Sequence, residues 1–268
     1  MQTGKSADPV RWRLIDTPPA PGAWNMAVDE ALAASVAGGG APVLRFYRWE
    51  PACLSLGRNQ PARGRYDLSA LAAAGIDVVR RPTGGRAVLH RRELTYSVAA
   101  PAALLGPPRH AYAAINRALV VGLRCLGAAA SLQPSTGARA PIPSLAPCFA
   151  EPVEGEVVAA GRKLVGSAQR VLGSVLLQHG SLPLHDDQSA VAALLAAPDV
   201  SVAEAPPATL SGVLGREPGW EELTAALAAG WEEALGAALA PDALTNAEID
   251  AARAAEERYA GPAWTWHQ

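Results

Sequence analysis

The 268-residue sequence has few cysteines, little charge and no long apolar run. Its three cysteines, Cys53, Cys125 and Cys148, form neither a disulfide framework nor a Cys-x-x-Cys zinc pair, which indicates a reducing compartment. The net charge is −2, so we do not expect nucleic acid as a ligand. No apolar run reaches the roughly 20 residues that cross a bilayer, and the N-terminus lacks a signal-peptide core. These absences predict a cytoplasmic protein that binds neither nucleic acid nor membrane.

The residues that are present predict one α+β domain. Half of them are hydrophobic, which at this length is enough for an ample core. Strand patterns dominate the middle and helical patterns are segregated, which disfavours a regular alternation of parallel strands and helices. Strands are expected at residues 12–16, 43–49, 52–57, 76–81, 86–90, 93–101 and in a meander over 156–184. Helices are expected from about residue 25 to 37, at 67–74 and 110–126, and in a helical C-terminal segment over about 219–268. Residues 129–152 are expected to form a long loop, of a length that is usually functional or disordered.

Two consecutive glycines, Gly84 and Gly85, occur in the stretch "RRPTGGRAVLH" at residues 80–90. They lie between two predicted strands and match neither the dinucleotide fingerprint nor the P-loop, so both of those sites are disfavoured. Glycines in a turn permit positive φ and let backbone N–H groups approach a carboxylate, a phosphate or an acyl carbonyl. A plain β-turn is the alternative.

Lys163 follows a predicted hairpin turn at residues 160–162, and the small residues Gly166, Ser167 and Ala168 come after it. Small side chains leave room beside a strand for a chain-like ligand. A lysine at the mouth of such a groove can polarise a carbonyl or lower the pKa of a thiol. The alternative is a solvated surface charge.

Cys148 is the one cysteine in the predicted long loop, whereas Cys53 and Cys125 lie in apolar segments typical of small buried side chains. A loop thiol becomes a nucleophile only where a cation or base lowers its pKa, and the sequence alone shows none beside it.

His90 and His179 each end an apolar run, and Gly180 follows the second. Each histidine is either a site residue or a strand-end residue that hydrogen-bonds to backbone. No carboxylate or second histidine lies at ligand spacing from them, so we expect no metal.

Several separate motifs resemble those of the lipoate-protein ligase and octanoyltransferase superfamily, in the same order. They are "NMAVDEAL", "PACLSLGRNQ", "RRPTGGRAVLH..ELTYS", "CFAEPVEGEVVAAGRKLVGSAQR" and "LQHGSL". They cover roughly residues 12–184, which is more specific than any single glycine loop. The resemblance implies a mixed sheet with flanking helices, shared with biotin ligases, in which the glycine loop and the lysine strand flank a tunnel for an eight-carbon acyl chain.

The resemblance also implies roles for individual residues. Gly84 and Gly85 would close over the acyl chain near its carbonyl, and Lys163 would be the family's lysine. Cys148 would be the nucleophile. The other acyl-binding residues would be Arg81, Thr83, Arg86, His90, Gly166, Ser167, Ala168, His179 and Gly180. An acidic residue often follows the histidine of the glycine loop in the family, but Arg91 stands there in this chain.

Within the superfamily, the form of the glycine loop, the position of Cys148 and the absence of an extra C-terminal domain favour an octanoyltransferase. The other octanoyltransferase type has its cysteine after the His-Gly motif, and no cysteine follows Gly180. The donor would be octanoyl-acyl carrier protein, and the acceptor a lipoyl-domain protein such as the glycine-cleavage H protein. We expect no cofactor and, by default, a monomer. The alternatives are a lipoate-protein ligase, which would need ATP and Mg, and a non-catalytic binder with the same fold.

Overall fold

The computed structural model describes residues 9–134, 154–197 and 206–268. Its centre is an eight-stranded sheet in the order β11-β1-β2-β6-β10-β9-β8-β7. The strands are β1 (Arg11–Asp16), β2 (Val43–Tyr47), β6 (Glu93–Pro101), β7 (Ala130–Leu132), β8 (Val157–Ala159), β9 (Arg162–Leu172), β10 (Val175–Pro183) and β11 (Ala238–Asp242). Strand β1 pairs in parallel with both β11 and β2. The next three pairs, β2 with β6, β6 with β10 and β10 with β9, are antiparallel. The predicted mixed sheet is confirmed.

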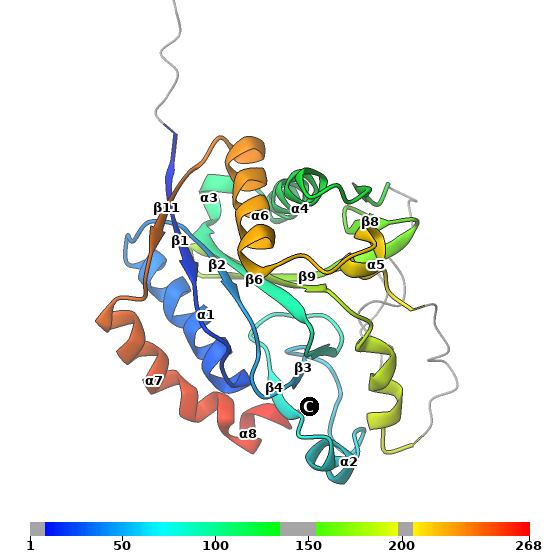
Figure 1. The fold of residues 1–268 in the computed structure, drawn as a ribbon. Coiled ribbons are helices and arrows are strands. Elements are labelled where there is room, and N and C mark those ends of the chain that lie inside the picture. The colour runs from blue at the N-terminus through cyan, green and yellow to red at the C-terminus, as the bar shows by residue number, and fades with distance from the viewer. Residues whose placement is uncertain (1–8, 135–153, 198–205) are drawn as a thin grey trace, which may run out of the picture.

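Helices cover both faces of this sheet (Figure 1). They are α1 (Gly22–Ala37), α2 (Leu68–Ala73), α3 (Ala102–Leu105), α4 (Pro108–Cys125), a 3₁₀ helix (Gln188–Leu194), α5 (Leu210–Leu214), α6 (Trp220–Leu235), α7 (Asn246–Ala260) and α8 (Pro262–Thr265). Strand β2 shows why both faces need cover: Leu44 and Phe46 pack in the core under α4 and α6, while Val43 and Tyr47 pack in the core with α1 and α7. Within the described ranges, no helix is both long and apolar enough to span a membrane.

A second, three-stranded sheet carries the glycine loop. Strand β3 (Cys53–Leu56) is its centre, with β4 (Asp77–Arg80) parallel on one side and β5 (Val88–His90) antiparallel on the other. The glycine loop therefore joins two strands, as predicted, and both are edge strands of this sheet. Since β6 begins at Glu93, directly after β5, the chain passes from this small sheet into the middle of the large one.

Local signals explain the elements that were predicted correctly. Asp67 caps α2 by accepting hydrogen bonds from the backbone N–H groups of Ser69 and Ala70. Ala160 and Gly161 have φ of 48° and 71°, the two positive values of a type I′ turn, and they join β8 to β9 at the predicted hairpin.

Two short strands were missed. The predicted long loop begins with β7, and the C-terminal segment predicted as helical contains β11. Strand β7 has three residues and β11 five, so neither shows enough alternation of apolar and polar residues to predict a strand. Each forms because a neighbour supplies hydrogen-bond partners, β8 for β7 and β1 for β11.

Helices α4 and α6 approach closely at Gly122 and Gly230. A Cβ at Gly230 would lie 2.2 Å from the backbone nitrogen of Gly122 and 2.6 Å from the carbonyl oxygen of Ala118. Backbone atoms cannot yield as side chains do, so Gly230→Ala should destabilise the fold by about 2 kcal/mol, despite the better helix propensity of alanine. Thermal unfolding measures this. Gly38→Ala is the control, because a Cβ there comes no closer than 3.4 Å to another atom, and an equal loss in both variants would contradict the prediction.

Candidate functional site

A narrow pocket lies over the large sheet beside the glycine loop, and its space, including the open solvent at its mouth, is about 330 Å³. The predicted site residues that line it are Arg81, His90, Gly166, Ser167, Ala168, His179 and Gly180. Its other lining residues are Met26, Tyr47, Trp49, Val88, Thr95 and Ser181. Segments far apart in the sequence therefore meet around one cavity.

The floor of the pocket is a row of residues across four strands. Tyr47 on β2 opposes Thr95 on β6, Thr95 opposes Ser181 on β10, and Ser181 opposes Gly166 on β9. Three strand spacings make this row about 14 Å long. Trp49 lies just beyond the β2 end, so the row leads from β9 to an aromatic side chain.

Gly180 is required by packing. A Cβ there would lie 2.6 Å from the ring of Tyr96 and 2.8 Å from both the carbonyl oxygen of Gly166 and the Oγ of Ser167. Without a Cβ at Gly180, the hydroxyl of Tyr96 can hydrogen-bond to Ser167 Oγ at 2.7 Å. Gly180 therefore allows Tyr96 on β6 and Ser167 on β9 to meet across β10.

Arg81 holds the glycine loop in shape. Its side chain is 4% exposed and donates hydrogen bonds to the carbonyl oxygens of Ser55, Gly84 and Arg86 at 2.7, 3.0 and 2.8 Å. Gly85 has a φ of +92°, where other residues are strained, whereas Gly84 has neither a positive φ nor any atom within 4 Å of an added Cβ. The backbone of this loop therefore requires glycine at Gly85 but not at Gly84.

Replacing Arg81 with lysine should lower the activity of the site, because one ammonium group cannot reach three carbonyl oxygens as the planar guanidinium does. A loop displaced by about 1 Å can cost about 100-fold in rate. Arg92→Lys is the matched control, since Arg92 pairs with Asp187 and is 55% exposed. Steady-state kinetics of both variants test this, and equal rates for Arg81→Lys and the wild type would contradict it.

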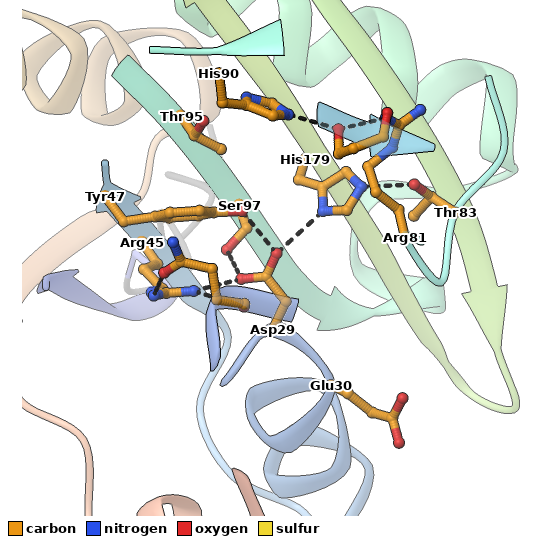
Figure 2. Close-up of polar contacts among 12 residues, drawn as sticks. Asp29, Glu30, Arg45, Tyr47, Arg81, Thr83, His90, Thr95, Ser97 and His179 are labelled. Atoms are coloured by element: carbon orange, nitrogen blue, oxygen red, sulfur yellow. Dashed lines mark hydrogen bonds and ion pairs between the residues drawn. The ribbon is translucent and has the colours of Figure 1, made fainter. Parts of the chain in front are cut away.

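His179 lies between a carboxylate and a hydroxyl (Figure 2). Its Nδ1 is 3.0 Å from Oδ2 of Asp29 on α1, and its Nε2 is 2.5 Å from Oγ1 of Thr83 in the glycine loop. Thr83 is fully buried and does not line the pocket. Thr83 lies behind His179, and the predicted residues Gly84, Gly85 and Arg86 are likewise not among those that line this pocket. Whether these four residues contact an acyl group stays a prediction.

His90 has a similar environment. Its Nδ1 is 2.8 Å from Glu93 Oε1, its Nε2 is 2.6 Å from Ser55 Oγ, and its ring stacks on Trp49 with centroids 4.1 Å apart. Arg81 donates to the same Ser55 hydroxyl at 2.6 Å. Both histidines thus link a buried carboxylate to the segments that hold the glycine loop.

Lys163 lies apart from the pocket lining. Its side chain is 3% exposed, and its Nζ is 2.6 Å from Oε1 of Glu156, which precedes β8. It is three residues before Gly166 on β9, so a solvated surface lysine is excluded. Cys148 lies outside the described residues.

Four polar residues of this region, Asp29, Ser55, Glu93 and Glu156, were not singled out from the sequence. One signal was available for Asp29: it lies four residues after Asn25 on α1, a helix with many apolar residues, so the two share one helix face. A carboxylate in such a setting requires a buried partner. The residues that pair with Asp29 lie on strands far from α1 in the sequence, so the sequence of α1 alone cannot predict them.

Comparison with known proteins agrees with this geometry. The model of the family "lipoyl protein ligase A/B catalytic domain" matches residues 21–232. The octanoyltransferase LipM of Kyrpidia tusciae is 42% identical, over 96% of this chain and 99% of that protein. The octanoyltransferase LipM of Symbiobacterium thermophilum is 40% identical, over 94% and 97%.

Solved structures agree as well. A bipartite lipoate protein ligase of Thermoplasma acidophilum, described with its E2 lipoyl domain, has a TM-score of 0.76 at 26% identity and covers 97% of each chain. A lipoate-protein ligase A bound with ATP also has a TM-score of 0.76 at 26% identity, covering 96% of this chain and 98% of that chain. This chain belongs to the lipoyl protein ligase A/B catalytic-domain family.

Proposed function

We propose that this protein is an octanoyltransferase. It moves an octanoyl group from octanoyl-acyl carrier protein to a lysine of a lipoyl-domain protein, such as the glycine-cleavage H protein, and Cys148 carries the group between them. The pocket across β9, β10, β6 and β2 is the observation that carries this proposal. The relatives named as octanoyltransferases, which match over nearly their whole length, support it.

The pocket suits a medium-length acyl chain. Seven carbon–carbon bonds of about 1.5 Å limit an octanoyl group to about 11 Å, which is shorter than the floor of about 14 Å. Met26, Trp49 and Val88 supply apolar surface, and Gly166 and Ala168 leave space beside β9. The acyl carbonyl would lie at the β9 end, near the glycine loop, and the methyl end toward Trp49.

In the first half-reaction, the Cys148 thiolate attacks the thioester carbonyl carbon of the donor. A carbon–sulfur bond forms to Cys148, the bond to the carrier's sulfur breaks, and the carrier leaves as a thiolate that takes up a proton. Lys163, an ammonium in its ion pair with Glu156, stabilises the Cys148 thiolate by its charge and by donating a hydrogen bond to it. Backbone N–H groups at Gly84 and Gly85 stabilise the oxyanion.

In the second half-reaction, the neutral amine of the acceptor lysine attacks the octanoyl-Cys148 carbonyl. The new bond is an amide, the Cys148 sulfur leaves and is reprotonated, and the amine gives up one proton. Because a thioester is exchanged for a more stable amide, the transfer requires neither ATP nor a cofactor. The cysteine content is compatible with a reducing cytoplasm as the location.

The test is transfer from octanoyl-acyl carrier protein to an apo lipoyl domain, followed by the mass of the acceptor. The proposal predicts acceptor octanoylation without ATP. Labelling that requires ATP and free octanoate or lipoate would instead indicate a ligase. A ligase is the second candidate because a solved structure similar to this chain is a lipoate-protein ligase A bound with ATP. Binding of the acceptor without labelling under either condition would indicate a non-catalytic binder.

A further inference from the structure

The carboxylate of Asp29 is held in one orientation behind the pocket. Asp29 is fully buried on α1, and its Oδ1 accepts hydrogen bonds from Arg45 Nη1 at 2.8 Å and Ser97 Oγ at 2.7 Å. Its Oδ2 accepts from the hydroxyl of Tyr47 at 3.0 Å and faces His179 Nδ1 at 3.0 Å. These partners come from β2, β6 and β10, so the large sheet fixes where Asp29 points (Figure 2).

The neighbouring acidic residue, Glu30, makes different contacts. Glu30 points away from this network (Figure 2). It accepts hydrogen bonds from Arg258 and Tyr259, both at 2.6 Å, which tie α1 to α7. Two consecutive acids on one helix thus differ in their contacts. Asp29 faces the site, and Glu30 faces another helix.

The charges of this network favour one form of His179. Burial tends to raise the pKa of the Asp29 carboxyl, but the hydrogen bond to His179 and the charge of Arg45 outweigh it and hold that pKa below its ordinary value. Burial also lowers the pKa of the His179 imidazole, against the opposing effect of Asp29. A charged Asp29 beside a neutral imidazole places the single ring proton on Nδ1, where the carboxylate accepts it.

With its proton on Nδ1, His179 has a lone pair on Nε2. That nitrogen can then accept the hydroxyl proton of Thr83, 2.5 Å away. Thr83 is not positioned as a nucleophile, because it is fully buried and absent from the pocket lining. Its carbonyl oxygen accepts from the backbone N–H of Arg58 at 2.8 Å, so both its side chain and its backbone are fixed.

We propose that Asp29 is a positioning residue for acyl transfer, acting through the tautomer of His179 on Thr83. Thr83 directly precedes Gly84 and Gly85, so its position sets where their N–H groups point. In this role Asp29 touches no substrate, and it supports the backbone amides to which the proposed function assigns the stabilisation of the oxyanion. The inference rests on the proposed function for its kinetic consequence, whereas the tautomer of His179 can be measured independently of activity.

The first experiment is ¹⁵N NMR of the histidine side chains in the wild-type protein, with His179 assigned through a His179→Gln variant. The proposal predicts a protonated Nδ1 and an unprotonated Nε2 at neutral pH. A protonated Nε2 would overturn it, because Thr83 could then not donate to that atom. This readout needs neither a donor nor an acceptor protein.

The second experiment compares Asp29→Asn with Glu30→Gln, which removes the same charge from the next residue of the helix. Asp29→Asn should lower kcat by about 10- to 100-fold with little change in KM, since the loop amides act on the transition state. Glu30→Gln should keep the wild-type kcat even if its melting temperature falls. An equal kcat for Asp29→Asn and the wild type would overturn the proposal.

A double-mutant cycle separates positioning from a general loss of stability. Thr83→Val should reduce kcat, Thr83→Ser should restore most of it, and Asp29→Asn should cause little further loss of kcat in the Thr83→Val background. Full additivity would mean that Asp29 does not act through Thr83 and would overturn the proposal. If the wild-type protein itself transfers no octanoyl group without ATP, the proposed function fails, and the NMR result still tests the tautomer.

Discussion

Replacing Cys148 with alanine is expected to reduce octanoyl transfer by at least about 1,000-fold, because without the thiol no acyl-enzyme can form. The rest of the pocket would still bind the acyl chain, so the loss should be in kcat. The measurement is the rate of acceptor octanoylation from octanoyl-acyl carrier protein without ATP.

The other two cysteines supply matched controls. Cys53 is fully buried, and burial raises the pKa of its thiol well above the ordinary value, so it is unsuited to act as a thiolate. The prediction of a buried Cys125 was wrong: this residue is exposed, because it is the last residue of α4, and it does not line the pocket. A Cys53→Ala variant and a Cys125→Ala variant should both keep the transfer activity. Loss of activity in either, or full activity in Cys148→Ala, would contradict the assignment of the nucleophile.

Replacing Lys163 with methionine is expected to lower kcat by about 100- to 1,000-fold, the usual effect of removing one group that stabilises charge at the reacting centre. The same change separates Glu156 from its ion-pair partner in a buried setting, which should lower stability on the order of 3 kcal/mol. Activity and thermal stability must therefore be measured together.

A second change separates these two effects. Combining Lys163→Met with Glu156→Gln removes both charges, so stability should recover while transfer stays low. Lys163→Arg keeps the charge but alters the geometry, and it should be more stable than Lys163→Met without regaining full activity. Recovery of wild-type activity in the double variant would show that Lys163 serves only the ion pair.

The sequence predicts most of the fold because most elements carry their own signals. Long periodic helices such as α4, the Asp67 cap and the turn at Ala160 and Gly161 depend on residues close together in the chain. The short strands β7 and β11 carry no such signal, because their stability comes from pairing with β8 and β1. The sequence therefore predicts the elements that residues close together in the chain stabilise, and it misses the strands that form only by pairing.

The site divides in the same way. Arg81, His90 and His179 lie in motifs that the family resemblance identifies, and they line the pocket. The carboxylate partners of the two histidines, Glu93 for His90 and Asp29 for His179, were not predicted, since each role depends on a contact made only in the folded protein. The burial of Thr83 behind His179 was not predicted either, because sequence order cannot show which way a loop residue turns.

The most direct test of the account is the intact mass of the protein after incubation with octanoyl-acyl carrier protein in the absence of ATP. We predict one octanoyl adduct on the wild type, absent from Cys148→Ala and discharged when an apo lipoyl domain is added. No adduct on the wild type, together with acceptor labelling only when ATP and free acid are supplied, would contradict the account and identify a ligase.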